Sequence, residues 1–260
     1  MQGWLTIADA LALEARMLVE IDKGKGAAPS VVPATEAGPL LQASANLNFG
    51  MTLNPGQEAA GRMILSSANR VVAVHGVAGA GKSSLLRPTA QILREHGKQV
   101  IGLGVQNTLV RMLERETGIP SMTLHRFLGQ HRKLLDGSAS KGQLGDARSG
   151  YRNTVLVFDE ASMVSTRDQD RLVRLANLLD VDRLVLVGDA QHLGAVEAGK
   201  PFALALALGT ETARMDTNLR ARSDTLKRAQ AAAQQGRTGE ALGHLKDHVI
   251  EASESGALLA

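Results

Sequence analysis

The stretch HGVAGAGKSS, residues 75–84, follows the apolar run RVVAV at 70–74 and precedes the helical pattern SSLLRPTAQILREH. Gly76, Gly81, Lys82 and Ser83 match the spacing GxxxxGK[ST] between a strand and a helix. Glycine lets the backbone turn its N–H groups toward phosphate oxygens, and the following helix N-terminus adds partial positive charge. The stretch therefore predicts a phosphate-binding loop.

The loop is expected to hold ATP together with Mg²⁺. Lys82 would reach the β and γ phosphates, and the Ser83 hydroxyl would ligate Mg²⁺. A glycine-rich turn with a chance lysine does not account for the full pattern in this context. The expected nucleotide-binding residues of the loop are Gly76, Val77, Ala78, Gly79, Ala80, Gly81, Lys82, Ser83 and Ser84.

Two acidic residues follow another apolar run, in FDEASM at 158–163. Ligands gather at the carboxyl ends of parallel strands, so these acids are expected beside the phosphate loop. Asp159 would hold Mg²⁺ through water, and Glu160 would orient and deprotonate the attacking water. Adjacent acids after a strand are also common at helix N-termini, so the catalytic assignment depends on the phosphate loop.

A third polar turn, VGDAQHLGAV at 187–196, follows the run RLVLV. A neutral amide just beyond a strand, here Gln191, can hydrogen-bond the γ phosphate or the water and so distinguish ATP from ADP. The turn is ordinary when taken alone, and its meaning comes from the two motifs before it.

Short apolar runs alternate with helical stretches along the middle of the chain. The runs are VVAVH (71–75), QVIGLGV (99–105), TVLVF (154–158) and RLVLV (183–187). Strands that are apolar on every residue are typical of sheets covered on both faces, and intervening helices favour parallel order. We expect a three-layer α/β core with a mostly parallel sheet.

The remaining segments suggest three parts: residues 1–50, 51–225 and 226–260. A helix is expected at 8–21, followed at 22–50 by a Gly-, Pro-, Ala- and Ser-rich linker or loosely packed arm. Asn54 as N-cap and Pro55 begin the next helix. Residues 136–150 are expected to form a mobile surface loop, and residues 226–260 a helical tail.

Composition narrows the class of protein. The chain has 260 residues and a net charge of +3. It contains no cysteine, which excludes disulfide and thiolate chemistry. No signal peptide or membrane-spanning run is evident, so the expected location is cytoplasmic. His244 and His248 are interpreted as a solvated helix face rather than a metal site.

Five motifs in order resemble the RecD-like branch of superfamily 1 DNA helicases. They are LNPGQEAAGRMIL (53–65), the phosphate loop, FDEASM, VGDAQHL and NLRARS (218–223). Within that branch the chain looks most like the helicase region of conjugative relaxases of the TraI/TrwC type, through GDAQHLGAVEAGKPF at 188–202. The resemblance covers most of residues 50–240.

The resemblance implies a RecA-like phosphate-loop NTPase lobe. By it, Gln57 contacts adenine, Gln191 couples hydrolysis to movement, and Arg220 faces the γ phosphate. Single-stranded DNA would contact residues 102–112 and 123–128, although VQN at 105–107 departs from the family pattern there. A second RecA-like lobe or other conjugation proteins are the further partners implied.

The DNA contact is expected to be through phosphates. Between Leu85 and Arg152 there are eleven basic and five acidic residues, an excess of six. Aromatic residues make up only 2% of the chain, so base stacking contributes little. Binding should be weak, indifferent to base sequence and strongly salt-dependent.

Only one lobe is recognised in the sequence, so we expect ATP to be bound well, hydrolysed poorly and not used for unwinding by this chain alone. A truncated gene product, an excised domain and a lobe completed by another chain stay open. Nicking activity is rejected because Tyr151 is the only tyrosine and histidines are not clustered. A vestigial or regulatory ATP-binding module remains the alternative, and a transporter ATPase is disfavoured.

Overall fold

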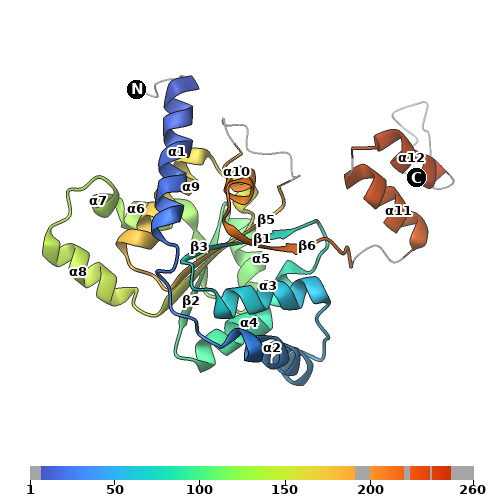
Figure 1. Ribbon diagram of the computed structural model, residues 1–260, viewed down its shortest axis with the longest axis horizontal. Coiled ribbons are helices and arrows are strands. Elements are labelled where there is room, and N and C mark those ends of the chain that lie inside the picture. Colours follow the sequence, from blue (N-terminus) through green and yellow to red (C-terminus); the bar gives the residue numbers. More distant parts are fainter. Residues whose placement is uncertain (1–6, 191–199, 220–222, 235, 247–260) are drawn as a thin grey trace. The chain divides into compact units, whose positions relative to one another are not determined.

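The computed structural model describes residues 7–190, 200–219, 223–234 and 236–246. Its centre is a six-stranded sheet in the order β3-β2-β4-β5-β1-β6, with every pairing parallel (Figure 1). The expected α/β fold is confirmed, and four strands lie where the sequence predicted them. The strands are β1 (Val71–Gly76), β2 (Gln99–Gly104), β3 (Ser121–Thr123), β4 (Thr154–Phe158), β5 (Arg183–Gly188) and β6 (Glu211–Met215).

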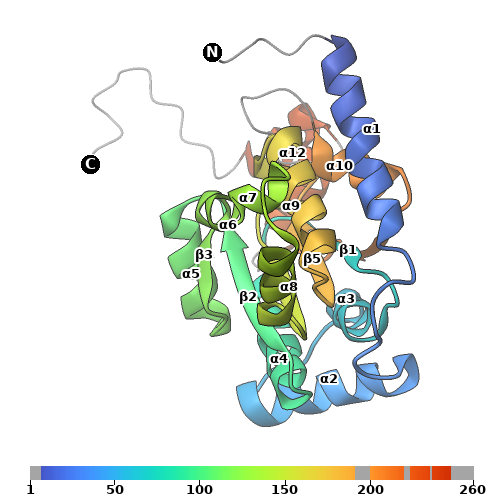
Figure 2. The same ribbon diagram turned by 90° about the vertical axis from the view of Figure 1, so that its left-hand side faces the viewer.

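Helices cover both faces of the sheet (Figures 1 and 2). On one face pack α2 (Ala34–Phe49), α3 (Pro55–Ser66), α4 (Lys82–Glu95) and α5 (Asn107–Thr117). On the other pack α1 (Ile7–Lys23), α6 (Leu124–Gln130), α7 (Arg132–Leu135), α8 (Lys141–Gly150), α9 (Thr166–Leu178) and α10 (Pro201–Ala207), together with a 3₁₀ turn, η1 (Ala161–Met163).

The two apolar layers explain why the strands are apolar on every residue. Val72 and Val74 of β1 join the layer under α2–α5, whereas Val71 and Ala73 join the layer under α1 and α9. Successive side chains of a strand point to opposite faces, so both parities must be apolar when both faces are buried.

The two edge strands were not predicted from the sequence. β3 has only three residues, and β6 exposes Glu211 and Arg214 while burying Ala213 and Met215. Because neither strand is a continuous apolar run, the pattern that identified the central strands does not detect them.

The prediction of a loosely packed arm at 22–50 is wrong for residues 34–49, which form α2. Leu41 and Ala45 of α2 are fully buried against α3 and α4. A Cβ added at Gly61 would lie 2.8 Å from Leu41 Cδ1, and one at Gly38 would lie 2.8 Å from Glu58 Oε1. The small residues that suggested a linker instead allow two helices to approach closely.

Residues 27–29, which precede α2, are held by the buried guanidinium groups of Arg70 and Arg183. Arg70 donates to Val181 O at 2.5 Å and Ala27 O at 3.3 Å, and Arg183 donates to Pro29 O at 3.3 Å. Arg183 is 1% exposed, and burial lowers its pKa to about 10. These bonds attach residues 27–29 to the sheet, so this part of the lead-in belongs to the core.

The prediction of a mobile loop at 136–150 is wrong for residues 141–150, which form α8. Ser140 caps this helix: its hydroxyl accepts from Gln143 N at 3.2 Å, and Gln143 Oε1 accepts from Ser140 N at 2.9 Å. This capping box was the sequence signal that the polar composition obscured.

The chain divides into two compact units after Thr217. The second unit contains α11 (Asp224–Gln234) packed on α12 (Thr238–Leu245). Both helices overlap the helical tail expected at 226–260, of which residues 247–260 lie outside the described part of the chain. The predicted boundary between residues 225 and 226 falls inside α11, and residues 34–49 belong to the first unit. In the described parts of the chain, every helix is too short or too polar to cross a bilayer.

Truncating Leu41 to alanine should lower the free energy of unfolding by about 2 to 5 kcal/mol, because it opens a cavity between α2 and α3. Leu47 lies on the same helix but is 84% exposed, so Leu47→Ala is the matched control and should change stability by less than about 0.5 kcal/mol. Denaturant unfolding measures both. Equal, small effects would show that α2 does not pack.

Candidate nucleotide-binding site

The sheet register brings three loops to one edge. β1 pairs with β5 through His75 and Gly188, and β5 pairs with β4 through Leu186 and Phe158. The phosphate loop follows β1, and Asp159 directly follows β4. Because all three strands are parallel, their carboxyl ends meet at the same edge, as the sequence predicted.

The phosphate loop has an open, left-handed backbone at two of its glycines. Gly79 and Gly81 have φ values of 79° and 78°, which other residues adopt only with strain. A Cβ at Gly76 would lie 3.0 Å from Lys82 Cγ, so the lysine stem needs a glycine beneath it. The backbone of the loop at Gly76 therefore packs directly against the Lys82 side chain.

The loop ends at the N-terminus of α4. The first bond within this helix joins Leu85 N to Gly81 O at 3.1 Å. The N–H groups of Lys82, Ser83 and Ser84 therefore have no partner within the helix. Such groups, together with the helix dipole, bind an anion such as a phosphate.

Lys82 extends toward the acids at the end of β4. Its Nζ donates to Gly76 O at 3.3 Å and lies 3.7 Å from Glu160 Oε1. In the same loop Ala78 is exposed, and Gly79, Ser83 and Ser84 are half-buried. The structure thus brings the predicted phosphate-binding lysine and the predicted catalytic glutamate together.

Asp159 and Glu160 are held by the backbone around them. Asp159 N donates to Leu103 O at 2.9 Å, and Asp159 Oδ1 accepts from Glu160 N at 3.0 Å. Burial raises the pKa of the Asp159 carboxyl to about 6, with the Glu160 charge adding to the effect and Lys82 opposing it. Asp159 therefore carries its negative charge at a cost that a cation beside it would offset.

Glu160 has a strained backbone and an unpartnered carboxylate oxygen. Its φ is 55°, an uncommon value for a residue other than glycine, and its Oε2 is buried without a hydrogen-bond partner within the described part of the chain. Strained residues and unsatisfied buried oxygens cluster at functional sites. Both features fit an acceptor for a water proton.

A third carboxylate, which the sequence analysis missed, lies at the same site. Ser83 Oγ donates to Glu116 Oε2 at 2.6 Å, although 33 residues separate the two in the chain. Glu116 sits in the last turn of α5, beside α4, and its charge also raises the pKa of Asp159. No local motif marks Glu116, because only the packing of α4 on α5 brings it to Ser83.

Gln57 braces the phosphate loop from α3. It is 2% exposed; its Oε1 accepts from Asn54 N at 3.0 Å, and its Nε2 donates to Gly81 O at 3.1 Å. Gln57 is therefore a buried residue, and Asn54 is the N-cap that the sequence predicted. Contact of Gln57 with adenine stays a prediction.

Gln191 and Arg220 lie outside the described residues, so their roles also stay predictions. The strand before Gln191 ends at Gly188, where a Cβ would lie 3.1 Å from Ser162 N. The backbone of β5 thus approaches the turn after Glu160 closely. Asp189 follows and is 6% exposed.

The two expected DNA-contacting segments begin at the carboxyl ends of β2 and β3, which lie at the same edge of the sheet. Residues 102–112 span the end of β2 and most of α5, and residues 123–128 span the end of β3 and the start of α6. Thr123 caps α6 by accepting from Arg126 N at 3.2 Å, which leaves His125 and Arg126 exposed.

Comparison with known proteins agrees with this geometry. The model of the family described as "AAA domain" matches residues 52–252. The chain belongs to the AAA domain family. The described part of the chain has the RecA-like phosphate-loop fold, and the chain is similar in sequence to TraI, as the motifs indicated.

Relatives of this AAA domain include conjugation proteins. It is 34% identical over 138 residues to a probable conjugal transfer protein TraA of Sinorhizobium fredii, covering 53% of the chain and 11% of TraA. It is 35% identical over 156 residues to the multifunctional conjugation protein TraI of Escherichia coli K12, covering 58% of the chain and 8% of TraI. The chain thus matches about a tenth of the length of these relatives.

The structure of the Pif1 helicase from Candida albicans shares the fold. The TM-score is 0.54 at 22% identity, and the match covers 79% of this chain and 50% of Pif1. The sheet and its helices therefore have the same fold as about half of the Pif1 structure.

The raised pKa of Asp159 predicts a pH-dependent stability. The native carboxyl holds its proton more tightly than an unfolded one, whose pKa is 3.8, so the free energy of unfolding should fall as pH rises from about 4 to about 6. The loss should be on the order of 3 kcal/mol. Asp159→Asn removes this titrating carboxyl. Denaturant unfolding at several pH values should therefore show the free energy of unfolding of the variant rising relative to that of the wild type between about pH 4 and about pH 6. A constant difference would contradict the buried, acid-flanked environment of Asp159.

Proposed function

We propose that the chain is the ATP-binding motor lobe of a DNA helicase that takes part in conjugative DNA processing, binding Mg²⁺-ATP and contacting single-stranded DNA. The observation that carries the proposal is the meeting of Lys82 and Glu160 at the phosphate loop, with Nζ and Oε1 3.7 Å apart. The names of the relatives, conjugal transfer and conjugation proteins and a helicase, support the task.

The residues of the loop would divide the work of binding. The backbone N–H groups at the start of α4 bind phosphate oxygens, and Lys82 neutralises the β and γ phosphates. Ser83 and Asp159 would hold Mg²⁺, whose positive charge would offset the charge developing on the phosphates. Hydroxyl and carboxylate oxygens are the ligands that this hard cation prefers.

Glu160 would position the attacking water and accept its proton through the unpartnered Oε2. Glu116 would orient the Ser83 hydroxyl by accepting its hydrogen bond, which leaves the oxygen lone pairs free to face Mg²⁺. Glu116 lies in α5, whose first residues belong to the expected DNA-contacting segment. A movement of α5 on binding DNA would therefore reach the nucleotide site directly.

Full turnover would require an arginine from a second RecA-like lobe, as in other enzymes that cleave ATP between two lobes. Such an arginine contributes roughly a thousandfold or more in rate. The part of the chain that the structure describes contains one six-stranded sheet, so we propose that the second lobe is contributed from outside it.

Lys82→Ala should abolish binding of Mg²⁺-ATP, measured by calorimetry or with a fluorescent nucleotide, because the side chain that neutralises the phosphates is gone. Lys133→Ala removes an exposed lysine far along the chain and is the matched control, which should leave the affinity unchanged. Unchanged affinity of the Lys82 variant would remove the phosphate-loop assignment.

Single-stranded DNA should raise the slow ATP turnover of the purified chain, because DNA and nucleotide would meet across α5. Glu160→Gln should bind nucleotide normally and lose the turnover, and it serves as the control for contaminating ATPases. Phosphate release with and without an oligonucleotide measures the effect. Turnover that DNA leaves unchanged would favour a regulatory module over a motor lobe.

A further inference from the structure

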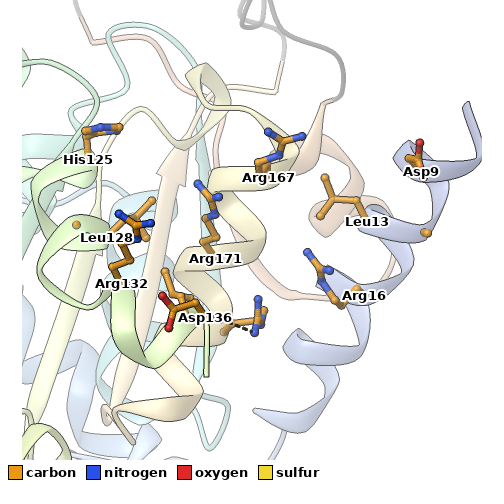
Figure 3. Close-up of a pocket in the computed structure, with 13 residues that line it drawn as sticks. Asp9, Leu13, Arg16, His125, Leu128, Arg132, Asp136, Arg167 and Arg171 are labelled. Carbon is orange, nitrogen blue, oxygen red and sulfur yellow. Dashed lines mark hydrogen bonds between the residues drawn. The ribbon is translucent and has the colours of Figure 1, made fainter. Parts of the chain in front are cut away.

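A groove with a volume of about 830 Å³, which shares no lining residue with the nucleotide site, lies between α1, the α6–α7 segment and α9 (Figure 3). α9 forms its floor, with α6 and α7 on one side and α1 on the other. We call it the arginine groove. Its basic residues are Arg16, His125, Arg132, Arg167, Arg171 and Arg174.

The charge of the arginine groove is only partly neutralised. Arg16 pairs with buried Asp170 at 2.6 Å, and Arg171 pairs with Asp168 at 3.4 Å. Arg174 donates to the Leu135 carbonyl at 3.3 Å, a neutral acceptor that leaves its charge in place.

The side chains of Arg132 and Arg167 are exposed and make neither a hydrogen bond nor an ion pair within the described part of the chain. Two aspartates, Asp9 and Asp136, also line the groove. Arg132 attracts the Asp136 carboxylate, which accepts from the Ser138 hydroxyl at 2.6 Å. Five guanidinium groups face four carboxylates, those of the lining Asp9 and Asp136 and those of the paired Asp168 and Asp170, which leaves an excess of one positive charge among the described residues.

The floor of the groove presents its arginines in a row. Arg167, Arg171 and Arg174 have the spacing i, i+4 and i+7, which places them on one face of α9. Successive members of this row lie about 6 Å and about 4.5 Å apart along the helix axis. A row of charges on a rigid helix suits a ligand whose own charge repeats.

The walls of the groove are fixed before any ligand binds. Arg16 holds α1 to α9 with two bonds to Asp170, at 2.6 and 3.0 Å, and Asn177 Nδ2 donates to Glu20 O at 2.8 Å. Because these contacts order α1 against α9 in the free protein, these two walls need not rearrange on binding.

The residue types favour a phosphodiester ligand. The basic side chains are arginine rather than lysine, and guanidinium groups bind phosphate oxygens in pairs. No Phe, Tyr or Trp is among the described residues that line the groove, so bases would not stack there. His125 and Leu128 of the groove belong to α6, within the expected DNA-contacting segment 123–128.

We propose that the arginine groove binds the phosphodiester backbone of a single strand of nucleic acid that passes the first turn of α6 and continues along α9 toward α1. This inference rests on the proposed contact of α6 with single-stranded DNA. It adds four arginines from α1 and α9 that lie outside the basic segment recognised in the sequence, Arg16, Arg167, Arg171 and Arg174.

The test is fluorescence anisotropy of a labelled oligothymidine with the full chain, as a function of salt. The double variant R132E/R167E changes two arginines that make no ion pair, and R62E, at an exposed arginine of α3, is the matched control. The double variant should bind at least tenfold more weakly, and its log–log salt slope should be smaller by about 1.4, because two phosphate contacts are lost. R62E should bind as the wild type does, and all three proteins should bind nucleotide equally.

A second double variant, H125A/R126A, separates this inference from the proposed function. Loss of binding in H125A/R126A with full binding in R132E/R167E would overturn the groove and leave the α6 contact standing. Full binding in both variants, or no binding by the wild type, would overturn both. If R132E/R167E loses binding to polyglutamate but keeps wild-type binding to the oligonucleotide, the groove takes an acidic polypeptide and the proposal is wrong.

Discussion

The parallel register of β1, β5 and β4 is the constraint on which the rest of this structure depends. It fixes where each strand ends, so the phosphate loop after Gly76, the acids after Phe158 and the turn after Gly188 share one edge. Parallel pairing in turn requires crossover helices on both faces, which bury every residue of the central strands. The polar site residues at the carboxyl edge of the sheet and the apolar residues within its strands are thus two results of the same parallel arrangement.

The helices behind the phosphate loop matter as much as the loop itself. α2 approaches α3 and α4 closely because Gly38 and Gly61 leave room, and α3 then presents Gln57 to the carbonyl of Gly81. Residues that a composition argument assigns to a flexible lead-in therefore support the nucleotide site. On the opposite face, the bond from Arg16 to Asp170 holds α1 on α9 and creates the arginine groove between them.

Much of the fold could be predicted because its determinants are local. The phosphate loop, the Asn54 cap and the four apolar strands each lie within a few residues, and their patterns follow from burial on both faces. The errors occur where composition and structure diverge. α2 has the glycine and proline content of a linker, α8 is mostly polar and glycine-rich but capped by Ser140, and β6 is an edge strand with one exposed face.

The sequence by itself determined the phosphate loop, the pair Asp159 and Glu160, and the α/β class, because each depends on spacing along a short stretch of chain. Only the tertiary structure decided that Glu116 accepts a hydrogen bond from the Ser83 hydroxyl and that arginines of α1, α7 and α9 line one groove. Those neighbours are far apart in sequence. Their contacts depend on how helices pack on a sheet, and no local pattern records that packing.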